Sequence, residues 1–129
     1  MALKINTKKL RKDAQLPSRT HQTDSGADLF CIENVELPPF VPVKIPTGIA
    51  VALPENTSGL VWGKSSVETL GVKVLAGLID STYRGEIIVC MINLTNETVK
   101  FAKGRKIAQL MVIPTFYPTF IETADLDET

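Results

Sequence analysis

The chain has 129 residues, of which 44% are hydrophobic and 22% are charged. This length suits one domain with a single core, and this composition is ordinary for a globular protein, which argues against disorder of the whole chain. Basic and acidic residues number 14 each. Because no overall field then favours nucleic acid or an anionic membrane, we expect neither as a partner.

The first 17 residues form an N-terminal segment that carries a basic run, Lys8, Lys9, Arg11 and Lys12. Such a run is more often a solvated face or arm than a targeting or nucleic-acid patch. The segment lacks the long apolar stretch of a secretory signal, and no apolar run in the chain reaches the length of a membrane span. We therefore expect an intracellular protein.

The cysteines Cys31 and Cys90 lie far apart in the chain, each among apolar residues. This context predicts buried free thiols in a reducing compartment. His21 is the only histidine, and no Cys or His pair has metal-ligand spacing, so a zinc site is not expected.

The stretch from Thr23 to Phe30 offers a first candidate site. Asp24 to Ala27 matches the Asp-Ser-Gly-Ala loop of aspartic proteases, in which two carboxylates share a proton. In those enzymes apolar residues precede the acid. Here the preceding stretch, residues 20–23, is polar, which disfavours a protease.

Eight prolines and eight glycines divide the chain into short segments rich in β-branched residues. The segments within residues 37–63, 86–94 and 106–114 are too short or too apolar for amphipathic helices and favour buried strands. Turn signals separate them, for example at Pro38-Pro39 and Gly104. The pattern predicts an all-β barrel or sandwich of many short strands.

The stretch Lys64 to Gly71 interrupts the strand pattern. Ser65 as N-cap with Glu68 three residues later predicts a capping box and about two turns of helix that end at Gly71. The start of a helix attracts anions, so Lys64, Ser65 and Ser66 form a possible phosphate cradle, although a purely structural cap is the commoner explanation. The serines are poor nucleophile candidates, because no nucleophile-elbow motif surrounds them.

Residues 71–77 and 86–92 predict the two arms of a hairpin, with Asp80 near its turn. An acid in a turn usually bonds the local backbone. The combination of Gly77, Asp80, Tyr83 and Gly85 is more specific, because it allows close backbone approach to a ligand beside one base and one ring. After the strand at 106–114, the acidic tail from Tyr117 to Thr129 predicts an arm leaving a single domain.

Four segments follow one another along the chain: SGADLF, GKSS, AGLIDSTYRGE and GRKIAQL. Together they resemble the first four signature motifs of the trimeric dUTP pyrophosphatases (dUTPases), and the resemblance covers about Ser18 to Thr129. It implies a jelly-roll-like β-barrel with one short helix. The barrel would assemble as a homotrimer with active sites at the subunit boundaries and hydrolyse dUTP to dUMP and pyrophosphate, limiting uracil in DNA and supplying dUMP for dTMP synthesis.

The resemblance also implies roles for individual residues. Asp80 would accept a hydrogen bond from the deoxyribose 3′-hydroxyl and activate the water that attacks the α-phosphorus, while Tyr83 would exclude a ribose 2′-hydroxyl. Uracil would be read by main-chain groups of the hairpin, at Gly77, Leu78, Ile79 and Ile88. The phosphates would be bound by Lys64, Ser65, Ser66 and Gln109. A Mg²⁺ ion on the triphosphate would be held by Asp28 through water.

The sequence departs from the family pattern in several places. Lys64 stands where the family usually has arginine, and Arg105-Lys106 where it has Asp-Arg. The sequence ends at Thr129, before the glycine-rich fifth motif that closes over uracil in the family, so we expect slow turnover. Two alternatives stay open, a dUTP-binding regulatory module of the same fold and a related dCTP deaminase. The deaminase is disfavoured, because residues 67–69 lack its arginine.

Overall fold

The computed structural model of the protein describes residues 3–129. This part of the chain contains eleven strands and one helix. In chain order they are β1 (Asn6–Lys9), β2 (Ala27–Phe30), β3 (Val35–Leu37), β4 (Val43–Pro46), β5 (Ile49–Ala52), β6 (Thr57–Gly63), α1 (Ser65–Glu68), β7 (Val72–Leu75), β8 (Leu78–Ile79), β9 (Ile88–Asn93), β10 (Val99–Phe101) and β11 (Lys106–Pro114).

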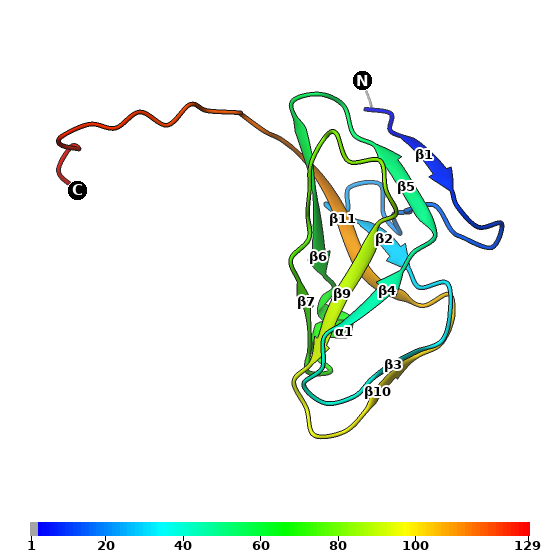
Figure 1. Ribbon diagram of the computed structural model, residues 1–129. Coiled ribbons are helices and arrows are strands. Elements are labelled where there is room, and N and C mark those ends of the chain that lie inside the picture. Colours follow the sequence, from blue (N-terminus) through cyan, green and yellow to red (C-terminus); the bar gives the residue numbers. More distant parts are fainter. Residues whose placement is uncertain (1–2) are drawn as a thin grey trace.

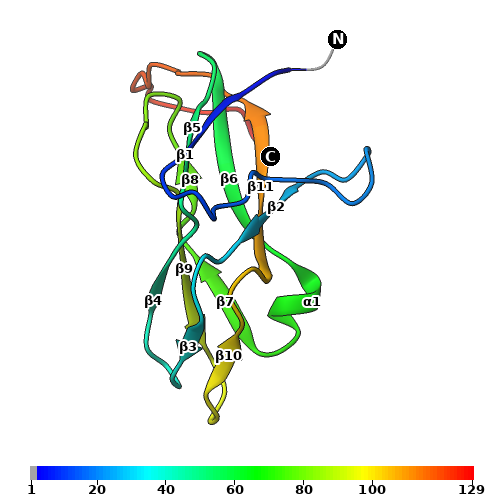
Figure 2. The same cartoon turned by 90° about the vertical axis from the view of Figure 1, so that its right-hand side faces the viewer.

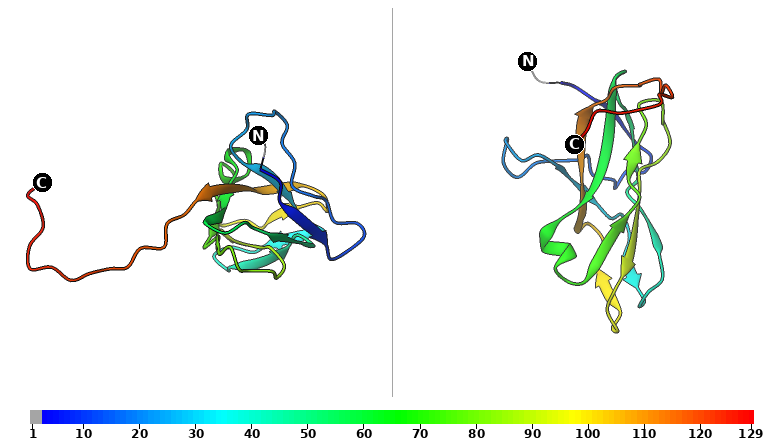
Figure 3. Two further views of the ribbon diagram at one scale, coloured as in Figure 1. Left: turned by 90° about the horizontal axis from the view of Figure 1, so that it is seen from above. Right: turned by 90° about the vertical axis from the view of Figure 1, so that its left-hand side faces the viewer.

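The strands form four antiparallel groups, ordered β1-β5, β10-β3, β2-β11-β6-β8 and β4-β9-β7. Figures 1 and 3 show these groups wrapped around a common centre as a barrel. Large apolar side chains fill that centre, among them Leu29, Leu37, Ile45, Ile49, Val89, Met91, Phe101 and Ile107. The predicted all-β barrel of short strands with one short helix is confirmed.

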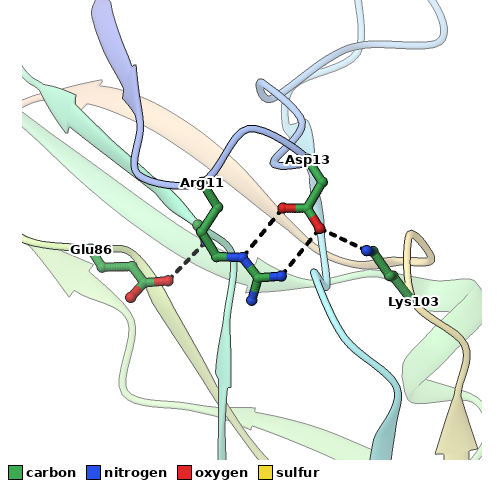
Figure 4. Close-up of polar contacts among 5 residues, drawn as sticks. Arg11, Asp13, Glu86 and Lys103 are labelled. Carbon is green, nitrogen blue, oxygen red and sulfur yellow. Dashed lines mark hydrogen bonds and ion pairs between the residues drawn. The ribbon is translucent and has the colours of Figure 1, made fainter.

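The N-terminal basic run lies on the surface. β1 pairs with β5, and Lys8 and Lys9 are exposed on this edge strand. Arg11 donates two hydrogen bonds to the carboxylate of Asp13, at 3.3 and 3.1 Å. The same carboxylate accepts from Lys103 Nζ at 2.6 Å, as Figure 4 shows. The run is therefore a solvated strand followed by a surface ion cluster.

The predicted capping box is wrong. The helix has only four residues, its N-cap is Lys64, and no side chain caps it. The Glu68 carboxylate accepts instead from the main-chain N–H of Val74, at 2.9 Å. A main-chain donor of β7 thus engages this carboxylate, so a tertiary partner takes the place of the local one.

The predicted hairpin is confirmed at its base and differs at its tip. β7 and β9 pair from Val72 opposite Asn93 to Leu75 opposite Cys90. At Ala76 and Gly77 the backbone has φ of 55° and 107°, and the chain leaves this sheet. The next two residues form β8, which pairs with β6 in the other large sheet. The turn that carries Asp80 thus connects two sheets, because β8 before it belongs to one and β9 after it to the other.

The chain leaves the barrel after β11. Residues 115–129 extend away from it as an arm without helix or strand, drawn in orange and red in Figure 1. The helix found among residues 3–129 has four residues and could not cross a membrane. Both cysteines are free thiols, with Cys31 buried as predicted and Cys90 only half-buried.

Candidate active site

Every residue that the sequence predicted for the site lines one of two pockets. The first, the hairpin pocket, has a volume of about 220 Å³ and is lined by Val61, Gly77, Leu78, Ile79, Asp80, Tyr83, Glu86, Ile87 and Ile88. The second, the cradle pocket, has a volume of about 250 Å³ and is lined by Thr20, Asp24, Ser25, Gly26, Asp28, Lys64, Ser65, Ser66 and Gln109.

The two pockets lie apart in the chain's fold. They share no lining residue. In Figure 2, β8 of the hairpin pocket is at the upper left, whereas α1, which carries the serines of the cradle pocket, is at the lower right. One chain therefore presents two half-sites of different chemistry, one built on a hairpin and one on a cluster of charged and hydroxyl groups.

The hairpin pocket depends on a close main-chain contact between Gly77 and Val61. The N–H of Val61 donates to the Gly77 carbonyl at 2.7 Å. A Cβ on Gly77 would lie 2.6 Å from the Val61 carbonyl oxygen, and the φ of 107° disfavours side chains in any case. Because the Gly77 carbonyl is engaged by β6, the N–H is the main-chain group that Gly77 can offer a ligand.

Ile88 stands across the hairpin pocket from Gly77. The β7–β9 pairing ends with Leu75 opposite Cys90, and Gly77 and Ile88 each lie two positions beyond this last pair. Both residues line the pocket. Facing main-chain groups on two antiparallel segments can pair with the edge of a planar ring much as a third strand would.

The turn at the tip holds its main chain tightly and leaves its acid free. The N–H of Tyr83 donates to the Asp80 carbonyl at 3.1 Å, and the Arg84 guanidinium donates to the carbonyls of Ser81 and Tyr83, at 2.6 and 3.1 Å. Within residues 3–129, no hydrogen bond or ion pair engages the exposed Asp80 carboxylate. A fixed backbone with a free carboxylate suits an acceptor or general base.

Glu86 and Gly48, which the sequence analysis did not predict, support the Tyr83 side of the hairpin pocket. The Tyr83 hydroxyl donates to the Glu86 carbonyl at 2.7 Å, which orients the tyrosine ring. The Glu86 carboxylate in turn accepts from the Gly48 N–H at 2.8 Å. Next to it, the Ile87 N–H donates to the Ile49 carbonyl at 2.9 Å. Glu86 lies inside the third motif, but its support from Gly48 is a long-range contact.

Strand register assembles the cradle pocket. Gln109 of β11 lies between Asp28 of β2 and Trp62 of β6. Residues directly opposite one another share a face of the sheet, which brings the amide and the carboxylate together. The Gln109 amide donates to the Gly63 carbonyl at 2.8 Å, and its other end packs on Gly26, where a Cβ would collide with it. Gln109 is therefore held in place before any ligand arrives.

Asp28 sits between two lysines. Its side chain is only 6% exposed, Oδ1 accepts from Lys64 Nζ, and Oδ2 lies 3.2 Å from Lys106 Nζ. Burial raises the pKa of Asp28, but the hydrogen bonds from Lys64 and Lys106 outweigh it and hold the pKa below its ordinary value. The carboxylate is therefore ionised at neutral pH, with both oxygens engaged by ammonium groups.

Lys106 is the main residue that sequence reasoning missed. It lies three positions before Gln109, and in a regular strand an odd spacing puts two side chains on opposite faces. The register of β11 against β2 shifts between Lys106 and Ala108. This β-bulge adds one residue to β11, so that Lys106 and Gln109 share the face that carries Asp28. Lys106 Nζ also donates to Thr20 Oγ1 at 3.2 Å.

The charge of the cradle pocket comes from the lysines. A four-residue helix contributes little of a macrodipole, because few peptide dipoles align. The hydroxyls of Ser65 and Ser66 are exposed and have no hydrogen-bond partner among the residues that the structure describes. They stay available to an anion bound beside Lys64. The lining residues Thr20, Asp24, Ser25 and Gly26 were not predicted individually, although two of them belong to the first motif.

The residues of the cradle pocket do not by themselves form a site for Mg²⁺. Between residues 3 and 129 there is no group of three or more His, Cys, Asp or Glu side chains that could hold a metal ion. Both oxygens of Asp28 already accept from ammonium groups. A dication approaching this carboxylate would meet two positive charges, so the donor set does not fit a protein-held Mg²⁺.

Comparison with known proteins agrees with the geometry. The dUTPase family model matches residues 12–129. A deoxyuridine 5′-triphosphate nucleotidohydrolase of Mycolicibacterium gilvum is 38% identical, covering 99% of this chain and 86% of that protein. The protein of the same name from Hydrogenobaculum sp. is 40% identical, covering 98% of this chain and 91% of its own length.

Solved structures give the same result. A mutant dUTPase of Staphylococcus bacteriophage 80alpha with bound dUpNHpp matches with a TM-score of 0.90 and 27% identity over 99% of this chain and 92% of its own. A mutant dUTPase from phage phi11 of S. aureus, whose structure reveals the coordination of a structural Mg(II) ion, matches with a TM-score of 0.88 and 26% identity over 95% and 98%. The expected jelly-roll type of barrel is thereby confirmed, and the chain belongs to the dUTPase family.

Proposed function

We propose that this chain hydrolyses dUTP to dUMP and pyrophosphate, with the hairpin pocket taking the deoxyuridine and the cradle pocket taking the phosphates. The observation that carries the proposal is the sorting of the motif residues into two pockets of matching chemistry. Gly77, Asp80 and Tyr83 line a pocket of main-chain groups, one ring and one free acid. Lys64 and its neighbouring hydroxyls line the other.

Base selection follows from main-chain groups. The Gly77 N–H donates to a uracil carbonyl, and main-chain groups at Ile88 face it across the pocket. The amino group of cytosine would present a donor where uracil presents an acceptor, and the methyl group of thymine would need space beside Ile88. The Tyr83 ring, fixed through its hydroxyl on Glu86, packs against the deoxyribose where a 2′-hydroxyl would clash.

Asp80 carries the chemistry. Its free carboxylate accepts from the 3′-hydroxyl and takes a proton from a water that attacks the α-phosphorus. The bond from the α-phosphorus to its bridging oxygen breaks, and pyrophosphate leaves with that oxygen. Lys64, Ser65 and Ser66 bind the phosphate oxygens. This contact positions the triphosphate for attack and stabilises the negative charge on the leaving pyrophosphate.

Mg²⁺ enters this proposal as part of the substrate. The ion arrives on the triphosphate, where it offsets the charge of the phosphate oxygens, and it keeps most of its waters. The mutant phi11 dUTPase coordinates a structural Mg(II) ion, so a protein of this fold does bind magnesium. The contact through water to Asp28 that the resemblance implied is not supported by a carboxylate already engaged by two lysines.

Complete sites would form between chains of a homotrimer. The separation of the hairpin and cradle pockets supports this arrangement, because the two pockets share no lining residue, whereas a nucleoside and its phosphates are joined in one substrate. In a closed ring, each chain presents its hairpin pocket to one neighbour and its cradle pocket to the other. Three equivalent sites result.

The test is pyrophosphate release from dUTP, dCTP, dTTP and UTP with the protein in excess, so that slow chemistry is measured. We expect release from dUTP alone, and only with Mg²⁺ present. Release from dCTP at a similar rate would contradict the main-chain selection of uracil. Tight dUTP binding without release would replace hydrolysis by a regulatory binding role.

Asp80→Asn tests the assignment of the base. The amide keeps the shape and can still bond the sugar but cannot take a proton, so we expect hydrolysis to fall by at least about a thousandfold while nucleotide affinity stays within about tenfold. Single-turnover kinetics and calorimetric titration with a non-hydrolysable α,β-imido analogue of dUTP measure the two quantities. Turnover like that of the wild type would rule out Asp80 as the base.

A further inference from the structure

The contacts around Asp28 assign it a role different from the one expected of a metal-holding acid. Oδ1 accepts from Lys64 Nζ, and Oδ2 lies 3.2 Å from Lys106 Nζ. The carboxylate is almost fully buried, whereas the two lysines are 23% and 45% exposed. The ammonium groups are thus held at the surface by an acid beneath them.

Lys106 belongs to this arrangement because of the bulge in β11. Without the register shift between Lys106 and Ala108, its side chain would lie on the face away from Asp28. With it, Lys106 contacts both Asp28 and Thr20, and each of these lines the cradle pocket. The Lys106 ammonium group therefore joins Lys64 and the two serines as a further group that can contact a phosphate.

The local charges favour an anion over a cation. Two ammonium groups share one carboxylate, and the other acid that lines the pocket, Asp24, accepts from the His21 N–H at 2.9 Å through Oδ2. The lysine ammonium is a point charge, unlike the planar guanidinium of arginine, so a single lysine does not fix the orientation of a phosphate group. Two converging lysines can do so. The geometry matches phosphate binding and disfavours a dication held by Asp28.

We propose that Asp28 is a positioning residue that holds Lys64 and Lys106 as a pair of phosphate-binding groups, and that it is not the group through which the protein binds the metal ion. This inference rests on the proposed function, because it takes the phosphates of dUTP as the ligand. Lys106 becomes a substrate-binding residue, and the affinity gained from Mg²⁺ belongs to the nucleotide rather than to Asp28.

The decisive measurement is the affinity of the α,β-imido dUTP analogue with and without Mg²⁺, by calorimetry, for the wild type and for Asp28→Asn. If Asp28 only positions lysines, the substitution changes both affinities by the same factor, so the ratio between them stays within about twofold. Loss of most of the Mg²⁺ enhancement, with the metal-free affinity unchanged, would overturn the inference and restore Asp28 as the metal's partner.

Lysine variants test the other half of the inference. Lys106→Met should weaken binding of the analogue by about tenfold or more, since a charge-assisted hydrogen bond is lost. Lys103→Met is the matched control, because Lys103 lies in the adjacent β10–β11 turn but binds Asp13 on the surface. Equal affinities for the two variants would show that Lys106 does not bind phosphate.

An NMR measurement without nucleotide tests whether Asp28 positions the two lysines, independently of whether the lysines bind phosphate. Held ammonium groups exchange their protons slowly, so the Lys64 and Lys106 Nζ signals should appear in side-chain ¹⁵N NMR spectra of the wild type and disappear in Asp28→Asn. Persistence of both signals would refute the positioning role. If the wild type binds no nucleotide while the signals behave as expected, the proposed function fails and the positioning contact stands.

Discussion

Tyr83 shows how a single hydrogen bond can convert an aromatic residue into a steric gate. The ring lines the hairpin pocket, and its hydroxyl is fixed on the Glu86 carbonyl at 2.7 Å. The side chain is 43% exposed, so packing alone would not hold it. If Tyr83 excludes ribose as proposed, that discrimination should depend on the anchor as well as on the ring.

We expect Tyr83→Ala to admit UTP, raising its kcat/KM relative to that of dUTP by about tenfold or more because the barrier to the 2′-hydroxyl is gone. Tyr83→Phe is the control that keeps the ring and loses only the anchor, and it should give an intermediate ratio. Parallel kcat/KM measurements with both nucleotides decide the matter. Unchanged discrimination in the alanine variant would remove Tyr83 from the gate.

Asp28 links the cradle to the pH dependence of stability. Its folded-state pKa lies below the ordinary value of 3.8, so the folded state binds its proton less readily than the unfolded state does. The stabilisation is complete above the unfolded-state pKa and is lost as pH falls through the folded-state value. Urea unfolding from about pH 6 to pH 2 should show a steeper loss of unfolding free energy in the wild type than in Asp28→Asn. Parallel curves for the two proteins would contradict the shift.

At the scale of elements, the tip of the hairpin is set by two residues in left-handed conformations. Ala76 and Gly77 turn the chain out of the β7–β9 sheet and onto β6. The Val61 backbone then passes so close that Gly77 has no room for a side chain. The shape of the hairpin pocket is therefore a property of the junction between two sheets, and the turn residues only complete it.

Gly77→Ala should destabilise the protein by about 1–3 kcal/mol from backbone strain, plus the cost of displacing Val61. Gly104→Ala is a matched control, because Gly104 also has positive φ, 87°, but its added Cβ would meet nothing closer than 3.6 Å. Urea denaturation of both variants isolates the clash. Equal losses of unfolding free energy would mean that the Val61 contact contributes nothing.

The bulge in β11 shows where local reasoning about an element stops working. The run from Lys106 to Pro114 was recognisable as a buried strand from its apolar residues, and it is one. A regular strand would put Lys106 on the face opposite Gln109, because an odd number of positions lies from one to the other. One extra residue in the pairing with β2 reverses that assignment, because side-chain direction alternates with every residue. The register shift depends on the partner strand, which the local sequence does not specify.

At the scale of the whole molecule, the separation of the two pockets makes assembly part of the function. The hairpin and cradle pockets share no residue, so a defect in one pocket leaves the other intact on the same chain. Two chains with different defects can then form one intact site between them. A site contained within one chain could not be restored in this way.

Co-expression of Asp80→Asn chains with Lys64→Met chains should therefore restore activity, to roughly a quarter of the sites if trimers mix at random. Each variant alone should be at least about tenfold slower than the wild type. Co-expression of Asp80→Asn with Asp80→Ala is the control, because both defects lie in the same half-site. If the first pair is no more active than this control, the sites do not lie between chains.

Local signals in the sequence were enough to predict the fold class, the strand segments, the base of the hairpin and the motif residues of both pockets. Proline and glycine spacing, β-branched runs and four ordered motifs are local signals that the chain carries in any conformation. No local signal indicated the pairing of Glu68 with Val74, the support of Glu86 by Gly48, or the place of Lys106 beside Asp28. Only the tertiary structure decided these, because each joins segments whose register and spacing are fixed when the sheets pack together.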